Sequence, residues 1–410
     1  MSDMKSNLPQ GATFDTTAQI AQTCQNCGSN TLSVFYAVDS IPIHSCLLMP
    51  TRTDALEYPK GNLHLAFCDN CGFVTNTHFD AGGQNYSAQY EETQGFSDRF
   101  NEFAEWLAKQ MISRYNIHNK TILEIGCGKG EFLTLMCQLS NNRGIGIDPA
   151  YVPDRNPDRG AGRIEFIQDS YSEKYCHIKA DVICCRHTLE HIAPTLKFMH
   201  TLRKAIGDRT NSLVFFEVPD VMRVLQEGAF WDIYYEHCSY FTAGSLARLF
   251  KATGFKIDDL YLAYDDQYVV ITAYPTNDPH AANLDLENDM QSLTCAVEEF
   301  ARQCRNRIDY WQSTIQEISD SGRKAVIWGS GSKGVAFLTT LKVTEAIKYV
   351  VDINPYRHGK FMPGTGQEIV SPQFLATYRP HKIIAMNPIY LGEIQKNIDR
   401  LDVRAELLTV

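Results

Sequence analysis

Four cysteines stand in the chain as two matching pairs, Cys24 with Cys27 and Cys68 with Cys71, and a glycine follows each pair. The two-residue gap lets both thiolates of a pair face one metal ion, and the glycine permits the tight turn that brings backbone N–H groups to sulfur. Four thiolates leave no open coordination position, so the pattern predicts a structural zinc site rather than a catalytic one. For a single C-x-x-C, a pair of buried thiols or a redox pair is the alternative.

A second group of chemistry-bearing residues lies in the stretch ILEIGCGKGEF, residues 122–132. Apolar residues flank Glu124, glycines follow at Gly126, Gly128 and Gly130, and a helical pattern begins after them. This order predicts a buried strand, a glycine-rich turn and a helix, whose backbone N–H groups can approach an adenosyl ligand. Many nucleotide binders share such a turn, so the residues that follow it carry more of the argument.

Acidic and basic residues end the next predicted strands. The run GIGIDP places Asp148 where a carboxylate accepts both hydroxyls of a ribose, and IEFIQD ends in Asp169, placed to contact an adenine edge. The following step, DVICCRHTLEHI, holds Arg186 and His187 at the carboxyl end of a strand, where ligands of α/β proteins collect. One acid after a strand is usually a turn or cap residue. Several such steps in order instead predict an adenosyl-binding core.

Size and charge narrow the class of protein. A chain of 410 residues is too long for one ordinary core, and its net charge of −10 does not favour nucleic acid or anionic membrane as a partner. Residues 1–80 contain three Lys or Arg and seven Asp or Glu, which argues against a zinc-bearing RNA-modifying enzyme. No apolar run of about 18 residues or secretory signal is visible. The thirteen cysteines, with Cys184 beside Cys185 in a buried-strand pattern, fit reduced thiols and a cytoplasmic location.

The order of patterns along the chain predicts its domains. We expect a loose tail over 1–22, a zinc-binding domain over 23–90, a middle α/β domain over 91–280, a long connecting helix over 281–320 and a second α/β domain over 321–410. Apolar residues recur every three or four positions from Leu286 to Ile318, which is typical of one amphipathic helix. That helix could pack on its own chain or form a dimeric coiled coil, so the protein is expected to be a monomer or homodimer.

The last domain opens with a second glycine-rich pattern. GSGSKG, residues 329–334, follows the predicted strand AVIW, and Asp352 ends the next strand, YVVD. This spacing matches the dinucleotide-binding fingerprint. Taken alone, it would indicate an NAD-dependent enzyme fused to the middle domain.

The ordered motifs resemble known families. The middle of the chain resembles class I S-adenosylmethionine (SAM) methyltransferases, and residues 22–410 resemble the sugar C-methyltransferases that act on nucleotide-linked keto-deoxysugars. The motifs are the two C-x-x-C-G pairs, EIGCGKG, RHTLEHI, FFEVPD, YYEHCSYFT and VDINPYRHGKFMPGT. The resemblance implies an α/β fold in which a class I SAM methyltransferase Rossmann-like domain joins an N-terminal zinc-binding domain and a second, C-terminal Rossmann-like domain. It also implies a SAM-dependent enzyme with structural Zn²⁺.

The resemblance assigns roles to individual residues. In that family a loop matching YYEHCSYF supplies a catalytic tyrosine, glutamate and histidine, which fall on Tyr234, Glu236 and His237. His187 would lie near the transferred methyl group, and Tyr90 would contact the sugar. The implied SAM-binding residues are Glu124, Gly126, Gly128, Gly130, Asp148, Asp169, Arg186 and His187. The family uses its last domain as a scaffold for the nucleotide-sugar site, without NAD.

The implied chemistry explains these residue types. Methylation of a carbon beside a ketone requires a base to remove a C–H proton and donors to stabilise the enolate. His237 is suited to be the base, Tyr234 or His187 the donors, and Glu236 an orienting group, whereas the isolated His191 is more often an ordinary core or surface residue. In an extended segment Tyr234 and Glu236 share one face, while a turn would instead bring Tyr234 and His237 together. Both arrangements stay open.

The substrate is less well defined by the sequence. Family members that act on trideoxy sugars carry a YPYxSS-like segment where this chain reads QYEETQGFS, residues 89–97. The additional hydrogen-bonding groups indicate a more hydroxylated sugar or a different carbonyl compound. Because the same His237 could deprotonate a hydroxyl or amine, O- or N-methylation is the alternative reaction, and a scaffold protein without activity is the alternative to an enzyme.

Overall fold

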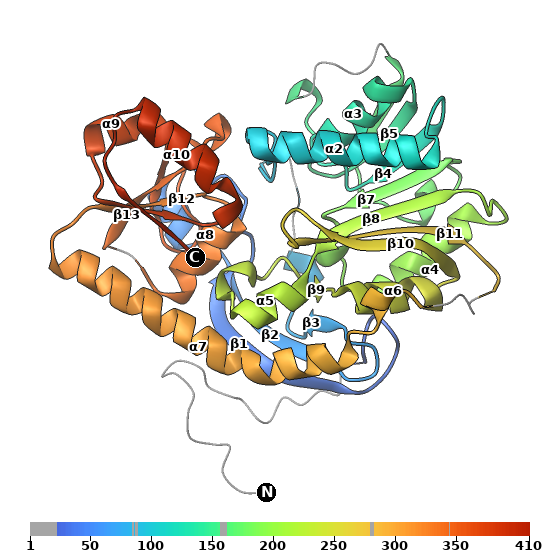
Figure 1. Cartoon of the computed structure of the whole chain (residues 1–410), viewed down its shortest axis with the longest axis horizontal. Coiled ribbons are helices and arrows are strands. Elements are labelled where there is room, and N and C mark those ends of the chain that lie inside the picture. The colour runs from blue at the N-terminus through green and yellow to red at the C-terminus, as the bar shows by residue number, and fades with distance from the viewer. Residues whose placement is uncertain (1–22, 84–85, 87–88, 156–161, 279–282, 344) are drawn as a thin grey trace, which may run out of the picture.

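The computed structural model describes residues 23–410 except 84–85, 87–88, 156–161, 279–282 and 344, so the predicted tail over 1–22 lies outside the described residues. Each of its three β-sheets lies in a different part of the fold (Figure 1). A long helix, α7, runs along one side of the molecule between the parts that hold the middle and C-terminal sheets. Within the described residues, no helix is both long enough and apolar enough to cross a membrane.

The N-terminal sheet is small and antiparallel. Its strands are ordered β1 (Leu32–Pro42), β2 (Lys60–Cys68), β3 (Val74–Asn76) and β9 (Ser239–Tyr240), and the short helix α1 (Arg52–Leu56) joins β1 to β2. The fourth strand, β9, comes from the YYEHCSYF segment, far away in the sequence. It pairs with β3 through Val74↔Tyr240 and Thr75↔Ser239. Part of the predicted catalytic segment is therefore built into the sheet of the cysteine-bearing region.

The middle sheet has seven strands in the order β10-β11-β8-β7-β4-β5-β6. Six of these strands run in the same direction, and β11 runs antiparallel to its neighbours β8 and β10. The strands are β4 (Thr121–Ile125), β5 (Arg143–Ile147), β6 (Ile164–Ile167), β7 (Val182–Arg186), β8 (Leu213–Pro219), β10 (Phe255–Ala263) and β11 (Tyr268–Pro275). The helices are α2 (Asp98–Tyr115), α3 (Glu131–Ser140), α4 (Thr195–Ile206), α5 (Val221–Glu227) and α6 (Ala243–Ala252).

This topology explains the composition of the central strands. β4, β7 and β8 are almost entirely buried, and helices lie on both faces of the sheet, so both faces of each strand must be apolar. The strand order reverses at β4, between β5 and β7, which is where open α/β sheets bind ligands. The predicted α/β fold class is confirmed.

The C-terminal sheet is entirely parallel. Its order is β14-β13-β12-β15-β16, with strands β14 (Glu368–Val370), β13 (Ile347–Val351), β12 (Ala325–Trp328), β15 (Lys382–Ala385) and β16 (Glu406–Thr409). The helices α8 (Ser332–Thr340), α9 (Leu375–Tyr378) and α10 (Leu391–Arg400) complete this unit. The order reverses at β12, which leads into the second glycine-rich turn.

The long helix α7 spans Met290–Asp320, so it begins later than the predicted start at 281, and Leu286 lies in a short 3₁₀ turn before it. Its apolar face is buried against its own chain. Phe300 packs edge-on against Tyr36 of β1, and Trp311 packs against Phe337 of α8, with ring centroids 5.1 and 5.2 Å apart. These contacts favour the connecting helix over the coiled coil.

Candidate active site

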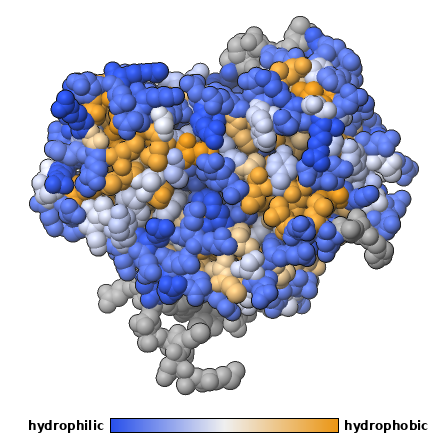
Figure 2. All heavy atoms as spheres, in the orientation of Figure 1, coloured by the Kyte–Doolittle hydropathy of each residue, from blue (hydrophilic) through white to orange (hydrophobic). Residues whose placement is uncertain are grey.

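A cavity of about 1440 Å³ lies where the middle and C-terminal units face each other. It is lined by the carboxyl ends of β4, β5 and β7 and by the glycine-rich turn after β12. Tyr90, residues 92–97, and Tyr234, His237 and Tyr240 of the predicted catalytic segment (residues 234–241) also line it. Figure 2 shows a largely hydrophilic face with apolar groups on both lobes beside the central hollow. Most of the sequence-predicted site residues meet in this cavity.

The first glycine-rich turn leads from β4 into α3. Gly126 and Gly130 both have positive φ, +71° and +85°. A Cβ at Gly126 would lie 1.9 Å from Oγ1 of Thr188, and one at Gly130 would lie 2.4 Å from the ring of Phe166. A larger residue at either position would be strained and would also clash, so glycine is required for this approach of backbone and neighbours.

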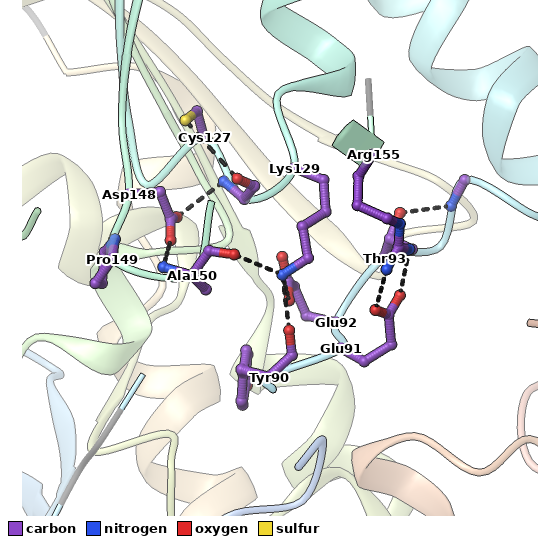
Figure 3. A network of polar contacts seen from close by, with 12 residues as sticks. Tyr90, Glu91, Glu92, Thr93, Cys127, Lys129, Asp148, Pro149, Ala150 and Arg155 are labelled. Carbon is purple, nitrogen blue, oxygen red and sulfur yellow. Dashed lines mark hydrogen bonds and ion pairs between the residues drawn. The ribbon is translucent and has the colours of Figure 1, made fainter. Parts of the chain in front are cut away.

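Asp148 follows β5 and holds this turn. Its Oδ2 accepts a hydrogen bond from the Gly128 N–H at 2.8 Å, and its Oδ1 accepts one from the Ala150 N–H at 2.7 Å (Figure 3). A carboxylate has about four lone-pair sites, so each oxygen can still accept a ribose hydroxyl. Burial raises the pKa of Asp148, while these two N–H groups oppose that rise. The turn and carboxylate fit the adenosyl part of SAM.

Glu124 and Arg186 are both buried beside the turn. Burial raises the pKa of Glu124 to about 8, and its Oε2 has no hydrogen-bonding partner among the described residues. A buried carboxyl of this kind can lose its proton when a ligand ammonium group, such as the one on SAM, supplies a cation beside it. Arg186 instead pairs with Glu217 at 2.9 Å and lies over the Phe132 ring at 4.0 Å, so its charge is already neutralised within the protein.

Asp169 lies outside the cavity wall in this structure. Its carboxylate pairs with Lys174 at 2.8 Å and accepts a hydrogen bond from the Tyr175 hydroxyl at 2.5 Å. Hydrogen bonds from Lys174, Tyr175 and the Ser170 N–H lower the pKa of Asp169 to about 2. The next residues, Ser170 and Tyr171, do line the cavity. The structure therefore brings the segment to the site, but not the predicted carboxylate.

His187 follows β7 with a left-handed backbone, φ +47°, which is uncommon for a residue other than glycine. Its N–H donates to the Glu217 carbonyl at 2.9 Å, and its Nε2 lies 2.6 Å from Glu217 Oε1. On the other side, Nδ1 lies 3.8 Å from Glu190 Oε1. Strained backbone held by such contacts is common at functional sites.

The predicted catalytic segment forms a turn, and this turn is the second of the two arrangements left open by the sequence. The His237 N–H donates to the Tyr234 carbonyl at 3.2 Å, and the two rings lie with centroids 4.2 Å apart. The side chain of Thr75 in β3 donates to the Cys238 carbonyl at 2.8 Å, which fixes the end of the turn. Tyr234 and His237 thus lie together in the cavity wall.

Electrostatics keep the His237 imidazole neutral. Its pKa is lowered well below the usual value by burial first, and then by His191, His187 and Lys333. His191 lies edge-on to His237 with ring centroids 4.8 Å apart. A neutral imidazole is the form that can accept a proton.

Glu236 is fully buried, and protein groups occupy both of its carboxylate oxygens. Oε1 accepts from the Ser45 N–H, and Oε2 accepts from the Tyr90 hydroxyl. Because Ser45 and Tyr90 both belong to the N-terminal region, these bonds fix the catalytic segment to that region. The structure therefore pairs Glu236 with Tyr90, and of the two only Tyr90 is among the described residues that line the cavity.

Three residues of the site received no role from the sequence. The Tyr86 hydroxyl lies 2.9 Å from Nδ1 of His191. A ring nitrogen of His191, a ring nitrogen of His237 and a carboxyl oxygen of Glu190 lie within 4.8 Å of one another. A tyrosine shortly before the predicted sugar-binding Tyr90 is the signal that could have found Tyr86. For Glu190, the LEHI pattern gives no sign that its side chain turns inward.

The four predicted metal ligands come together. Cys24 and Cys71, and likewise Cys27 and Cys68, have sulfur atoms 3.7 Å apart, and all four sulfurs lie within 4.8 Å of one another. A tetrahedron with Zn–S bonds of about 2.3 Å has S···S edges of about 3.8 Å, whereas a disulfide would need about 2.05 Å. The donor set and its spacing fit zinc.

The backbone around these cysteines repeats itself. The Gly28 N–H donates to the Cys24 carbonyl and the Gly72 N–H to the Cys68 carbonyl, each at 2.8 Å. Both glycines have positive φ, +77° and +72°. The two C-x-x-C-G turns therefore have one geometry, as expected of two halves of a metal site.

Comparisons with known proteins agree with this architecture. Residues 96–260 match the family described as Methyltransferase domain, and residues 275–405 match the C-methyltransferase C-terminal domain. The C-methyltransferase NovU of Streptomyces niveus is 27% identical over 291 residues, which cover 67% of this chain and 68% of that protein.

Solved structures also resemble part of the chain. The 1,6-didemethyltoxoflavin-N1-methyltransferase of Burkholderia thailandensis, bound to S-adenosylhomocysteine, is 17% identical, with a TM-score of 0.35, over 44% of this chain and 82% of that one. The magnesium protoporphyrin IX methyltransferase of Synechocystis PCC 6803 is 13% identical, with a TM-score of 0.34, over 43% of this chain and 84% of that one.

The seven-stranded sheet, the glycine-rich turn, Asp148 and the matched methyltransferase domain define a SAM-dependent methyltransferase. With the C-methyltransferase C-terminal domain after it, the chain belongs to the SAM-dependent C-methyltransferase family that its motifs indicate.

Proposed function

We propose that this enzyme methylates a carbon beside the carbonyl of a nucleotide-linked sugar, with His237 as the general base. The observation that carries the proposal is the turn that sets the neutral His237 against Tyr234 in the cavity that also contains Asp148. A C–H proton beside a ketone is weakly acidic, so a positioned base is worth roughly 10² to 10⁴-fold in rate. SAM, bound by the glycine-rich turn and Asp148, supplies an electrophilic methyl group.

The residues of the chain would prepare the nucleophile. His237 accepts the C–H proton, and the hydroxyl of Tyr234 is available to donate to the oxygen on which charge develops. His187 is held by Glu217 at 2.6 Å at the end of β7, and we propose that it contacts the substrate near the methyl group. Glu236 acts by positioning, because its two oxygens bind Ser45 and Tyr90 and so hold the catalytic turn in place.

The cavity supports a substrate larger than a free sugar. Its volume of about 1440 Å³ exceeds the range of roughly 300 to 1,000 Å³ that is usual for a single ligand. It extends from Asp148 to the turn after β12, across two α/β units. We propose that SAM occupies the side of the middle domain and that the nucleotide part of the substrate extends toward the C-terminal domain.

The polar segment QYEETQGFS gives little support to a different substrate. Glu91 pairs with Arg155 at 2.6 Å and accepts from Asn354 at 2.9 Å, while Glu92 pairs with Lys129 at 3.2 Å. These carboxylates connect structural units and are already bound. The polarity of Glu91 and Glu92 therefore has a structural reason, and these two residues are no argument for a more hydroxylated substrate.

We also propose that zinc holds the N-terminal region in the form that positions the catalytic turn. Cys68 is the last residue of β2, Cys71 lies in the turn that leads to β3, and β3 pairs with β9 of the catalytic segment. The zinc would therefore stabilise the fold that supports the catalytic turn and would take no part in the reaction. We further propose that the chain divides into the zinc-binding, methyltransferase and C-terminal domains expected from its sequence.

The decisive experiment incubates the enzyme with SAM and a panel of nucleotide sugars, with and without a 4-keto group. Mass spectrometry should detect a methylated product with the keto-sugars, and NMR should locate the new methyl group on the carbon beside the carbonyl. A methyl group on oxygen or nitrogen would contradict the proposal. The His237→Asn variant is the matched control, because it should bind SAM and give little product.

A further inference from the structure

Glu190 lies in the wall of the active-site cavity and has no role in the proposed reaction. It belongs to the short 3₁₀ turn Leu189–His191 after β7, and it is only 2% exposed. Its Oε2 is buried without a hydrogen-bonding partner among the described residues. A carboxyl oxygen of Glu190 lies within 4.8 Å of ring nitrogens of both His191 and His237. An unpaired polar atom thus lies beside the proposed base.

Two buried glutamates of this site have opposite surroundings. Glu217 pairs with Arg186 at 2.9 Å and with His187 at 2.6 Å. Burial would raise its pKa, but Arg186 and His187 lower it to about 2. Among the described residues no lysine or arginine pairs with Glu190, and its nearest ionisable partner is His187 at 3.8 Å. Burial raises the pKa of Glu190 to about 8.

The protonation states follow from this difference. An isolated carboxylate in a dry site is costly, so a buried carboxyl without a cation keeps its proton. Glu217 is therefore the anion of the pair and Glu190 the neutral acid. Such a divided pair of carboxyl groups is a common way for one site to hold both an acceptor and a donor.

We propose that Glu190 is a catalytic residue that donates a hydrogen bond from its carboxylic O–H to the carbonyl oxygen of the substrate. This inference rests on the proposed carbon methylation beside a carbonyl. When His237 accepts the C–H proton, the C–H electron pair becomes the new C=C bond, and the carbonyl π pair moves onto oxygen. The hydroxyl of Glu190 keeps its proton and stabilises the oxygen anion. A preorganised donor of this kind is worth about 10² to 10³-fold in rate.

Several titratable groups face Glu190 from the surrounding elements. They are His187 and His191 from its own loop, Cys185 from β7, Glu217 from β8, Tyr234, His237 and Cys238 from the catalytic segment, and Tyr86 from the N-terminal region.

Most of these groups do not change charge near pH 8. The pKa of His191 is lowered to about 4 and that of His237 is also low, both mainly because of burial. Burial raises the pKa of Cys238 to about 12 and the pKa values of Tyr86 and Tyr234 well above the usual 10. The carboxyl of Glu190 carries its proton below about pH 8 and loses it above that pH, so its hydrogen bond to the substrate should be lost as pH rises.

The test compares Glu190→Gln with Glu190→Ala in the zinc-loaded full chain. Glutamine has similar size and still donates a hydrogen bond, so Glu190→Gln should lose less than about 10-fold in kcat, and Glu190→Ala at least about 10². The wild-type kcat should fall above about pH 8, and this fall should be absent in Glu190→Gln. SAM binding by calorimetry should be unchanged in both variants, which shows that they are folded.

Other results would overturn the proposal. Equal kcat values for the two variants, an alkaline fall that persists in Glu190→Gln, or a second metal ion per chain that disappears with Glu190→Ala would each do so. The chemical identity of the product separates this proposal from the proposed function. A methyl group on oxygen or nitrogen defeats the proposed function, whereas a C-methyl product made at an unchanged rate by Glu190→Ala defeats only the role of Glu190.

Discussion

The chain contains two glycine-rich turns with similar sequence patterns, but the aspartates that follow them have different hydrogen-bonding partners. GCGKG joins β4 to α3, GSGSKG joins β12 to α8, and an aspartate follows the neighbouring strand in each case, Asp148 after β5 and Asp352 after β13. The Asp148 oxygens each accept one backbone N–H. In contrast, Oδ2 of Asp352 accepts both the N–H and the hydroxyl of Ser330, at 2.9 and 2.5 Å, and Oδ1 accepts the Asn354 N–H at 2.8 Å.

A single side chain accounts for the difference. Ser330 stands where the first turn has Cys127, and it is 1% exposed. Its hydroxyl occupies an acceptor site on Asp352 that a ribose hydroxyl would need, and Arg357 donates to the Ser330 carbonyl at 2.8 Å. The glycine pattern therefore predicts the turn. How easily a nucleoside can bind there depends on how many hydrogen bonds the following aspartate already accepts from the protein.

The lysines of the two turns have a shared role in connecting parts of the chain. Lys129 is fully buried, and its ammonium donates to the carbonyls of Tyr90 and Ala150 at 2.7 and 2.8 Å and to Glu92 at 3.2 Å (Figure 3). Lys333 pairs with Asp232 of the middle unit. Both ammonium groups thus bind other parts of the protein.

The largest effect on kcat should come from removing the proposed base, which lies in the cavity beside the first turn. His237→Asn removes the proposed base and should lower kcat by at least roughly 10²-fold without weakening SAM binding, as measured by steady-state kinetics and calorimetry. Tyr234→Phe and Glu236→Gln should have smaller effects. In deuterated water with S-adenosylhomocysteine bound, exchange at the methylated carbon should be lost in His237→Asn and kept in Tyr234→Phe. Exchange that survives in His237→Asn would assign the base to another residue.

Replacing the two lysines should have different effects on the free energy of unfolding. Lys129→Met leaves two buried carbonyls and Glu92 without their donor, at about 1 to 3 kcal/mol per group, and should lower the free energy of unfolding by about 3 kcal/mol. Lys333→Met should cost only about 1 kcal/mol, because Asp232 keeps Arg223 at 2.8 Å as a partner. Urea unfolding of both variants measures the difference, and equal losses would contradict the assignment.

Asp148→Ala and Asp352→Ala test the ribose site directly. Asp148→Ala should weaken SAM binding by about 1.5 to 3 kcal/mol, the cost of losing charged hydrogen bonds. Asp352→Ala should leave SAM affinity unchanged, which makes it the matched control. Calorimetry with SAM measures both.

The second turn can be tested with its own ligand. Titration with NADH should leave the nicotinamide fluorescence unchanged, because the Ser330 hydroxyl already binds Asp352. Tight NADH binding that disappears in Asp352→Ala would contradict this expectation and show that the second turn binds a dinucleotide as well.

The smallest effect on the SAM site should follow from loss of the metal. Purified protein should contain about one zinc per chain, and Cys27→Ser should remove it, because four thiolates complete the tetrahedral site. SAM affinity should change little in this variant, while kcat falls as the pairing of β3 with β9 loosens. Metal analysis measures the zinc content, calorimetry the SAM affinity and steady-state kinetics the kcat. Native protein without zinc would contradict the proposed four-cysteine zinc site.

The sequence was sufficient for features that depend on residues close together in the chain. The glycines at Gly126 and Gly130, the acid at Asp148 and the paired C-x-x-C-G turns follow from spacing, because strand, turn and helix geometry fix where neighbours lie. The fold class and the methyltransferase activity expected from these motifs are confirmed. The assignment of His237 came from resemblance to a family and stays a prediction.

The tertiary structure decided the features that depend on partners distant in sequence. Tyr234 and His237 face each other because Thr75 and the β3–β9 pairing hold the turn, and Glu236 is held by Ser45 and Tyr90, which no local pattern indicates. The acids of QYEETQGFS bind Arg155 and Lys129 for the same reason. Spacing determines the backbone conformation of a segment, but the hydrogen-bonding partner of a buried side chain depends on which distant element packs against it.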